Sequence, residues 1–319
     1  MAGTVHRRSK IAIIGAGSVG ATIAYACLIR GVGKTIALHD VDATKTRAQV
    51  LDLDQGISFV PMANVVGSDD IAVTADADIV VITAGAKQKP GQTRMELAGT
   101  NVAMCRELMP ALVAMSPDAL FLLVTNPVDV LTYAALAFSG LPSHRVFGSG
   151  TVLDSSRLQT LIAQHCGVAV QNVHAFIAGE HGDSEFPMWS NASVGPVPLR
   201  EWSIPGRPAV DEEVQAMMAD RVVGAAAEII RGKGATSYAI GLAATRIIEA
   251  ALYDENRILP VSTMLNGPYG IEDVCLSLPT IVNRRGVDTV LTPPLAPAEV
   301  AALRRSADTV REVARSLHL

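Results

Sequence analysis

A short apolar segment near the start of the chain leads into closely spaced glycines. Residues 11–14 are continuously apolar, as in a strand buried on both faces, and the pattern Gly15-x-Gly17-x-x-Gly20 follows. The apolar character of Val19–Leu28 then suits a helix. The N–H groups at a helix N-terminus bind phosphate, and glycines let a ligand approach the backbone closely. Strand, glycine turn and helix together predict a site for a dinucleotide pyrophosphate.

An acidic residue lies where such a site needs one. The second apolar segment, Thr35–His39, ends in Asp40, twenty residues after the last of the three glycines. A carboxylate at this point accepts hydrogen bonds from the adenosine ribose and repels a 2′-phosphate, which predicts NAD rather than NADP as cofactor. Two alternatives stay open: Asp42 could take this role, or Asp40 could be an ordinary solvated residue at a strand end.

Polar residues also follow the fourth and fifth apolar segments. Thr83-Ala84-Gly85 opens a polar loop that runs to Arg94 and contains a Pro-Gly pair, so this loop is a candidate mobile lid. The sequence Val124-Thr125-Asn126-Pro127-Val128-Asp129 closes the fifth segment.

The second half of the chain adds three candidates. Asp154 and Arg157 are three residues apart, on one face of a predicted helix, and His181 lies among glycines. Taken alone, Asp154 and Arg157 suit a surface ion pair, and His181 suits an ordinary loop histidine. A histidine beside a carboxylate can move a proton, and a guanidinium can bind a small anion.

The elements that must position these residues alternate between strands and helices. The predicted strands of the first half are Ile11–Ile14, Thr35–His39, Asn64–Val66, Ile79–Thr83, Leu120–Thr125 and Arg145–Gly148. Right-handed crossovers turn such a series into an open parallel sheet with ligand sites at the carboxyl ends of its strands. We therefore predict an α/β fold, with a six-stranded, doubly wound, Rossmann-type domain over residues 1–150 that binds NAD.

Residues 151–319 have a different pattern, which predicts a second, α+β domain that contains Asp154, Arg157 and His181. Its predicted helices are Leu153–His165, Asp211–Arg231 and Ser237–Tyr253, and its main strands are Arg257–Met264 and Asp273–Val282. A C-terminal helix has apolar residues at 300, 303, 307, 310 and 314.

Composition excludes several classes of protein. With 49% hydrophobic and 18% charged residues among 319, the chain can bury a large core and is not intrinsically disordered. The net charge of −5 and the lack of a long basic run argue against nucleic acid as a partner. The four cysteines are isolated and the seven histidines are scattered, so we expect neither disulfides nor a metal site, and we expect a reducing cytoplasm.

One uncharged stretch could be mistaken for a membrane segment. Residues 11–29 carry no charge and follow several basic residues, as in a signal peptide or a membrane span. The three glycines in its middle are unfavourable in a membrane helix. We therefore interpret the stretch as a buried strand joined to a phosphate-binding helix, and we predict no membrane association.

Seven motifs occur together along the chain, from about Lys10 to the C-terminal helix. They are GAGSVG, DADIVVITAGAKQKPGQTR, VTNPVDVLTY, GSGTVLDSSRL, GEHGDSE, KGATSYAIG and GIEDVCLSLPTIV. With these motifs in this order, the chain resembles the lactate and malate dehydrogenase family, and within that family it is more similar to the lactate branch. The resemblance implies reversible, NADH-dependent reduction of pyruvate to (S)-lactate, as in anaerobic glycolysis and pyruvate fermentation.

The same resemblance implies roles for the polar residues. His181 is the acid/base catalyst, because hydride delivery to a ketone leaves an alkoxide that must be protonated. Asp154 orients the ring of His181. Arg157 binds the substrate carboxylate with two parallel hydrogen bonds, and Arg94 closes with the lid to polarise the ketone oxygen.

Further residues are assigned by resemblance alone. The substrate-binding set is Gln88, Arg94, Asn126, Arg157 and Thr236. The cofactor-binding set is Gly15, Gly17, Val19, Gly20, Asp40, Lys45, Ala84, Gly85, Val124, Asn126, Ser149 and Ile240. Without the resemblance, Asn126, Thr236 and Ile240 suit a turn former, a helix cap and a core residue.

Gln88 separates two substrates within the family. The malate branch usually has arginine at this position, which pairs with the second carboxylate of oxaloacetate, whereas glutamine suits the methyl group of pyruvate. Malate or another 2-hydroxy acid is therefore the alternative substrate. A non-catalytic NAD-binding protein is a further alternative, against which Arg94, Asp154, Arg157 and His181 together argue. A short-chain reductase is disfavoured because no tyrosine has a lysine four residues later.

The resemblance also raises the questions of assembly and regulation. It implies a homotetramer. Some bacterial relatives bind an activating fructose 1,6-bisphosphate through a histidine and an arginine, which here correspond to His174 and Gln159. Because glutamine cannot replace the bidentate phosphate ligand, we expect weak or absent activation.

Overall fold

The computed structural model describes residues 9–86, 94–203 and 209–319. The first half consists of β1 (Lys10–Ile14), α1 (Ser18–Arg30), β2 (Thr35–His39), α2 (Ala43–Gln55), β3 (Asn64–Ser68), β4 (Ile79–Ile82), α3 (Arg94–Met115), β5 (Leu120–Leu123), α4 (Val128–Ser139) and β6 (Val146–Gly148). All six strands predicted for this half are present. Their ends differ from the prediction by at most two residues.

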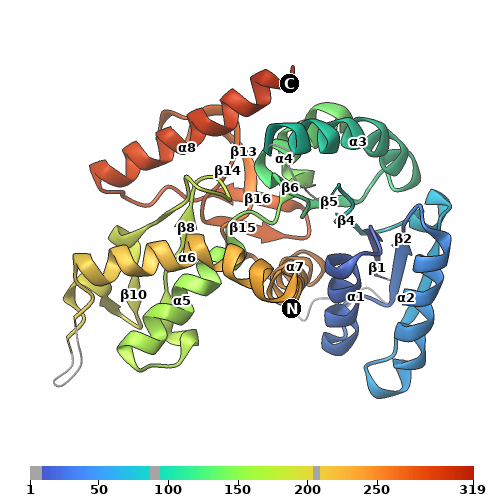
Figure 1. Ribbon diagram of the computed structural model, residues 1–319, viewed down its shortest axis with the longest axis horizontal. Helices are drawn as coiled ribbons and strands as arrows, with labels where there is room; N and C mark the ends of the chain where they lie inside the picture. Colours follow the sequence, from blue (N-terminus) through green and yellow to red (C-terminus); the bar gives the residue numbers. More distant parts are fainter. Residues whose placement is uncertain (1–8, 87–93, 204–208) are drawn as a thin grey trace.

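The second half is richer in short strands. It consists of α5 (Val152–Cys166), β7 (Val173–His174), β8 (Ile177–Ala178), β9 (Phe186–Pro187), β10 (Ser193–Val194), β11 (Val197–Pro198), α6 (Glu212–Lys233), α7 (Tyr238–Leu252), β12 (Arg257–Leu259), β13 (Ser262–Asn266), β14 (Glu272–Ser277), β15 (Thr280–Asn283), β16 (Gly286–Val290) and α8 (Pro297–Ser316). In Figure 1, α5 and α6 lie on the left and α1 and α2 on the right, with the sheet strands between.

Six parallel strands form the centre of the main sheet, in the order β6-β5-β4-β1-β2-β3. This confirms the predicted doubly wound sheet. The strand order reverses between β1 and β4, which pair in parallel from Ile11 opposite Ile79. Such a reversal leaves a crevice at the carboxyl ends of the two strands, where ligands of α/β proteins bind.

The sheet also continues into the second half of the chain. β13 pairs antiparallel with β6 through Ser262 and Gly148, and β14 pairs antiparallel with β13. The predicted strand Arg257–Met264 is therefore wrong in its extent. It divides at Pro260 into β12, which belongs to a separate sheet with β15 and β16, and β13 of the main sheet. Proline has no N–H to donate to a ladder, which favours a break where the chain changes sheets.

The predicted strand Asp273–Val282 divides in the same way. β14 ends at Ser277, Pro279 follows, and β15 begins at Thr280. β16 was not predicted at all. Its two polar residues, Asp288 and Thr289, are adjacent and exposed, so the segment carries little of the continuous apolar signal that marks the buried parallel strands.

Side chains of the parallel strands alternate between two cores. Ala12 and Ile14 of β1 face a core formed with α3, α4 and α8, whereas Ile11 and Ile13 face a core formed with α1 and α7. Both faces are buried in every parallel strand except the edge strand β3, which explains why the inner strands are mostly apolar along their whole length rather than alternating. A third, smaller core joins α5 and α6 to the short strands of the second half.

The helices end close to the predicted positions. In α8, Leu303, Ala307, Val310 and Ala314 are buried and Val300 is partly buried, so the predicted apolar stripe is confirmed. The uncharged stretch 11–29 divides at its glycines into β1 and α1. Over the described ranges, no helix has both the length and the apolar character needed to cross a membrane.

Candidate active site

The glycine turn after β1 has the shape expected of a phosphate-binding loop. Gly15 has a φ of 104°, and a Cβ there would lie 2.8 Å from the backbone nitrogen of Ala84. A Cβ at Gly20 would lie 1.9 Å from the carbonyl oxygen of Gly15. These two glycines are therefore required by packing between β1, β4 and α1.

The middle glycine differs from its neighbours. A Cβ at Gly17 would meet no atom of the described residues within 4 Å, and no side chain among them caps α1, whose N-cap is Gly17. The first N–H groups of α1 are thus presented to open space. Uncapped donors and the helix dipole favour an anion at this point, so the turn fits a pyrophosphate.

Asp40 contacts this turn directly. Its Oδ2 accepts a hydrogen bond of 2.8 Å from the backbone N–H of Ala16 and lies 2.7 Å from Nζ of Lys45. Burial opposes ionisation of Asp40, but the bonds from Lys45, Asp42 and Ala16 outweigh it and lower its pKa, so the side chain is a carboxylate.

Asp42 has a different task. Its side chain accepts a hydrogen bond from the backbone N–H of Lys45 and caps α2. Of the two aspartates that the sequence left as alternatives, only Asp40 therefore contacts the glycine turn through its side chain. A ribose bound beside this turn would meet Asp40 and Lys45.

The ends of β4, β5 and β6 lie side by side at the same edge of the sheet. The N–H of Val124 donates to Ile82, and the N–H of Ser149 donates to Leu123. A Cβ at Gly85 would lie 2.4 Å from Cγ2 of Thr125. The predicted cofactor residues Ala84, Gly85, Val124 and Ser149 therefore lie along one edge of the sheet, with Ala84 next to Gly15 of the glycine turn.

Asn101 of α3 connects this edge to the start of the predicted lid. Its Oδ1 accepts from the N–H of Ala86, and its Nδ2 donates to the carbonyl of Asn126. The Asn126–Pro127 peptide is cis, and the Asn126 side chain is exposed. Gln88 lies outside the described residues. Arg94 is described only as the first residue of α3, without its side chain.

His181, Asp154 and Arg157 form one hydrogen-bonded cluster. His181 Nδ1 is 2.6 Å from Oδ2 of Asp154, and Arg157 Nη1 donates to the other carboxylate oxygen at 2.7 Å. Only 1% of the Asp154 side chain is exposed, against 25% for His181 and 16% for Arg157. The carboxylate is therefore shielded from water while both of its partners reach the surface of the site.

Charge in this cluster favours a protonated histidine. Burial alone would lower the pKa of His181, but the Asp154 carboxylate outweighs burial and raises it to about 9. Burial likewise opposes ionisation of Asp154, but His181 and Arg157 keep its pKa below the usual value. Near neutral pH the cluster holds an imidazolium, whose Nε2 is not engaged by Asp154 and can give up a proton.

Asp129 holds the histidine loop in place, a role that was not predicted from the sequence. Its Oδ2 accepts from the backbone N–H of His181 at 2.7 Å, and its Oδ1 accepts from the Ser262 hydroxyl at 2.6 Å. Asp129 is 2% exposed, and burial raises its pKa to about 6. From the other side, Ser306 of α8 accepts from the N–H of Glu180. The loop that carries His181 is thus held by α4, β13 and α8.

Glu185 was also overlooked. One ligand atom each of Asp154, His181 and Glu185 lies within 4.8 Å of the others. This is the spacing of a small metal site, but the atoms of Asp154 and His181 are already joined by a hydrogen bond. The only sequence signal for Glu185 is its place at the end of the motif GEHGDSE.

The remaining predicted residues lie around this centre or away from it. Thr236 lies between α6 and α7, and Ile240 of α7 packs against the same core as Val19. His174 is exposed on β7. The Gln159 amide donates to the carbonyl of Ala175, so its side chain turns inward against the chain.

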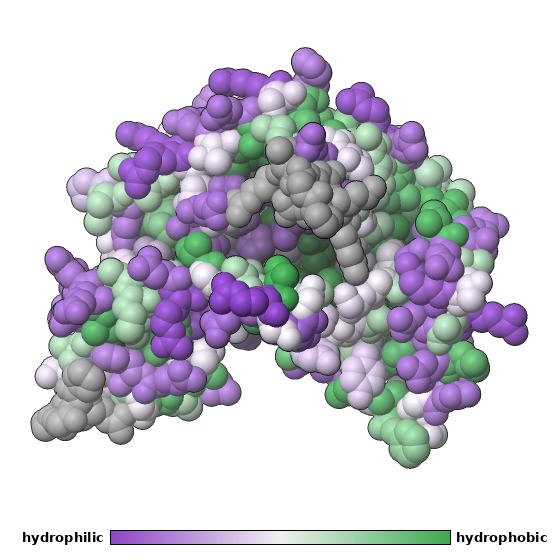
Figure 2. Space-filling model, viewed as in Figure 1, coloured by the Kyte–Doolittle hydropathy of each residue, from purple (hydrophilic) through white to green (hydrophobic). Residues whose placement is uncertain are grey.

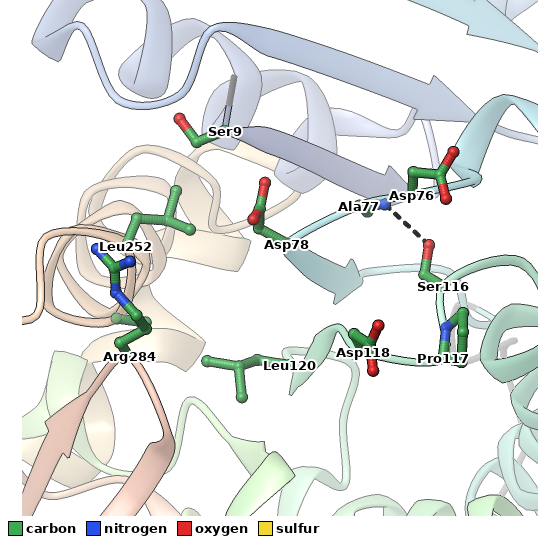
Figure 3. Close-up of a pocket in the computed structure, with 11 residues that line it drawn as sticks. Ser9, Asp76, Ala77, Asp78, Ser116, Pro117, Asp118, Leu120, Leu252 and Arg284 are labelled. Carbon is green, nitrogen blue, oxygen red and sulfur yellow. Dashed lines mark hydrogen bonds between the residues drawn. The ribbon is translucent and has the colours of Figure 1, made fainter. Parts of the chain in front are cut away.

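Of two hollows in the described residues, one is lined by Arg157 of the His181–Asp154–Arg157 cluster and the other by none of these three residues. A groove of about 700 Å³ between α5 and α6 is lined by Arg157. Figure 2 shows that the molecular surface is recessed between its two lobes, where polar and apolar residues meet. A second cavity of about 330 Å³ lies at the amino-terminal edge of the sheet, where Asp78 and Asp118 precede β4 and β5 (Figure 3). Its carboxylates disfavour an anion, and it lies opposite the glycine turn.

Comparisons with known proteins cover nearly the whole chain. Residues 9–148 match the family model of the lactate/malate dehydrogenase NAD binding domain, and residues 151–317 match that of its alpha/beta C-terminal domain. The L-lactate dehydrogenase of Bifidobacterium animalis subsp. lactis is 51% identical over 307 residues, 96% of each chain. That of Thermoanaerobacter sp. is 43% identical over 98% of this chain and 100% of the relative.

Solved structures give the same result. A minor L-lactate dehydrogenase from Enterococcus mundtii, in a ligands-bound form, superposes with a TM-score of 0.93 at 39% identity and covers 97% of this chain and 98% of its own. A lactate dehydrogenase from a Medee basin deep-sea metagenome library gives a TM-score of 0.94 at 39% identity, covering 98% and 100%. The chain belongs to the lactate/malate dehydrogenase family.

Proposed function

We propose that the protein is an NAD-dependent L-lactate dehydrogenase that interconverts pyruvate and (S)-lactate. The observation that carries this proposal is the cluster of His181, Asp154 and Arg157, which combines a proton donor with a guanidinium for a small carboxylate. The relatives at 43% and 51% identity carry the same name. NAD, when bound, supplies or accepts the hydride.

The residues of the chain account for the other requirements of the reaction. Gly17 and the N-terminus of α1 would bind the pyrophosphate of NAD, and Asp40 with Lys45 would bind the ribose. Ala84, Gly85, Val124, Asn126, Ser149 and Ile240 would line the rest of the cofactor site. The residues at the ends of β4 and β5 would then hold the nicotinamide part of the cofactor.

Proton transfer rests on His181. The imidazolium gives its Nε2 proton to the ketone oxygen as pyruvate is reduced, and the neutral ring takes it back when lactate is oxidised. Asp154 holds Nδ1, which fixes the ring and stabilises its charge. An arginine side chain has five N–H donors, and Nη1 of Arg157 donates to Asp154. The other donors can bind the substrate carboxylate. Arg94 would polarise the ketone.

Substrate choice depends on a residue outside the described ranges. Gln88 is neutral, so the proposal includes pyruvate rather than oxaloacetate, with Thr236 lining the substrate pocket. Steady-state assays that follow NADH absorbance with pyruvate, oxaloacetate and longer 2-keto acids test this directly. A larger kcat/KM for oxaloacetate than for pyruvate would support a malate dehydrogenase instead.

Assembly and location are further parts of the proposal. Tyr25 and Ile29 of α1 and Tyr238 and Leu242 of α7 are more than half exposed, on two helices that pack together. Such an apolar face suits contact with another copy, as in a homotetramer. Light scattering on the purified protein tests this state. We also place the enzyme in the cytoplasm.

We further propose that fructose 1,6-bisphosphate activates this enzyme weakly or not at all. Position 159 holds glutamine instead of arginine, and the Gln159 amide donates inward to the carbonyl of Ala175. The exposed His174 therefore has no arginine at position 159 with which to bind a phosphate. A large decrease in the KM for pyruvate on addition of the bisphosphate would refute this part.

A further inference from the structure

Glu185 is a second carboxyl group beside the catalytic pair. It lies four residues after His181, just before β9, and one of its oxygens is within 4.8 Å of an Asp154 oxygen and of a His181 ring nitrogen. Its side chain is partly buried. The mechanism above assigns it no role.

The surroundings of Glu185 disfavour a second negative charge. Asp154 and Arg157 face it from α5, and His181 faces it from its own loop. Asp129 of α4 adds a further carboxyl group beside His181. Both oxygens of Asp154 already accept charged hydrogen bonds, so His181 and Arg157 are largely neutralising Asp154. Two carboxyl groups this close in a water-poor site share a proton more readily than they both ionise.

The direction of the ionisation agrees with this geometry. Burial, followed by the charge of Asp154, raises the pKa of Glu185 well above its usual range, against the opposing effects of His181 and Arg157. The pKa of Asp154 moves the other way. The proton therefore resides on Glu185 at neutral pH.

Building on the proposed function, we propose that Glu185 is a positioning residue whose protonated carboxyl group hydrogen-bonds Asp154 and keeps one net positive charge on the cluster when the keto-acid anion binds. With Glu185 neutral, the charges of Asp154, His181 and Arg157 sum to one positive charge, which a substrate monoanion cancels. The nearby Asp129 carboxylate adds the same negative charge whether or not Glu185 is ionised. With Glu185 ionised, the occupied site would carry a net negative charge away from bulk water, which weakens binding.

The proposal predicts a pH effect on KM rather than on kcat. As pH rises, loss of the Glu185 proton removes the positive charge of the cluster, so the KM for pyruvate increases. Loss of the His181 proton increases it further. Replacing Glu185 by a group that never ionises should remove the first effect and leave the second.

Glu185→Gln tests this, because glutamine keeps the size of the side chain and a donor for Asp154. We expect its KM for pyruvate to stay within about twofold of the wild-type value near neutral pH, and to be lower than wild type by about tenfold near pH 10, with similar kcat. Glu180→Gln is the matched control, because it makes the same substitution in the same loop. The Glu180 carboxylate accepts a hydrogen bond from the Ser184 hydroxyl rather than facing Asp154. It should follow the wild-type profile.

Equal KM values for wild type and Glu185→Gln near pH 10 would overturn the proposal. A much lower KM for the variant already at neutral pH would overturn it too, because Glu185 would then be ionised there. An infrared spectrum of the wild-type enzyme provides a measurement that needs neither the variant nor turnover. A protonated-carboxyl band at neutral pH that disappears at high pH supports the proposal, and its absence contradicts it. Failure of the wild type to reduce pyruvate would instead contradict the proposed function.

Discussion

His181 Nδ1 and Asp154 Oδ2 lie 2.6 Å apart, although the two residues come from a loop after β8 and from the first turn of α5. The bond directs the other ring nitrogen, Nε2, away from the buried carboxylate. Because Asp154 is almost completely buried, its charge acts on the ring with little screening by water. The pair therefore sets both the orientation and the protonation of His181, the proposed catalyst.

Asp154→Asn should move the pH range of pyruvate reduction downward. Asp154 raises the pKa of His181 to about 9, against the effect of burial, so removal of its charge lets burial lower that pKa. Pyruvate reduction needs the protonated ring, and kcat/KM should fall by about 100-fold or more near neutral pH. The pH profile of kcat/KM checks this. An unchanged upper limb would mean that Asp154 does not control His181.

Asp40→Ser should weaken the preference for NADH. The substitution removes the carboxylate that contacts Ala16 and repels a 2′-phosphate, so the KM for NADH should rise by about tenfold and the ratio of NADH to NADPH activity should shrink. Asp42→Ser is the control, because serine can still cap α2. If Asp42→Ser changes cofactor preference more than Asp40→Ser, the assignment of these two aspartates is reversed.

Gln88→Arg should shift preference toward oxaloacetate. A guanidinium at this position would pair with the second carboxylate of oxaloacetate and place an unpaired charge beside the methyl group of pyruvate. Steady-state kinetics with both substrates measure the ratio of the two kcat/KM values. No change in that ratio would show that Gln88 does not determine specificity.

Loss of the proton from Asp129 should lower the stability of the enzyme as pH rises from about 4 to about 6. Burial raises the pKa of its carboxyl group from 3.8 to about 6 in the folded protein, so the folded state holds this proton to a higher pH than the unfolded chain does. Protonated Asp129 therefore adds about 3 kcal/mol to the free energy of unfolding at low pH. This stabilisation is lost as pH rises through the window.

Asp129→Asn removes that titration. The difference in Tm between the variant and the wild type should therefore shift in favour of the variant as pH increases across the window. Comparing the two proteins cancels the opposite trend from Asp154, whose pKa is lowered. A difference that stays constant with pH would show that Asp129 does not titrate there.

The sequence was most informative where all the residues that define a site lie in one short segment of the chain. Gly15, Gly17 and Gly20 could be assigned because the strand before them and the helix after them are adjacent in the chain. Asp40 could be distinguished from Asp42 only in the structure, because the difference lies in whether the side chain reaches Ala16 or caps its own helix.

Contacts between distant segments were beyond the reach of the sequence. Asp129 meets His181 and Ser262 only after α4, the histidine loop and β13 are assembled. The extension of the main sheet by β13 and β14 depends on the chain changing sheets at Pro260, which apolar patterning does not reveal. Glu185 ends the motif GEHGDSE, but the motif does not show that its carboxyl group lies close to Asp154, which is distant in the sequence.

The central claim is that this protein reduces pyruvate with NADH through a proton held by His181. The most direct measurement is NADH consumption with pyruvate in a single turnover, for the wild type, His181→Gln and a control, His144→Gln, at an exposed position in the first half of the chain. We predict rapid consumption by the wild type and the control, and a rate for His181→Gln that is lower by about 1,000-fold. Comparable rates for wild type and His181→Gln, or no consumption by the wild type, would contradict the claim.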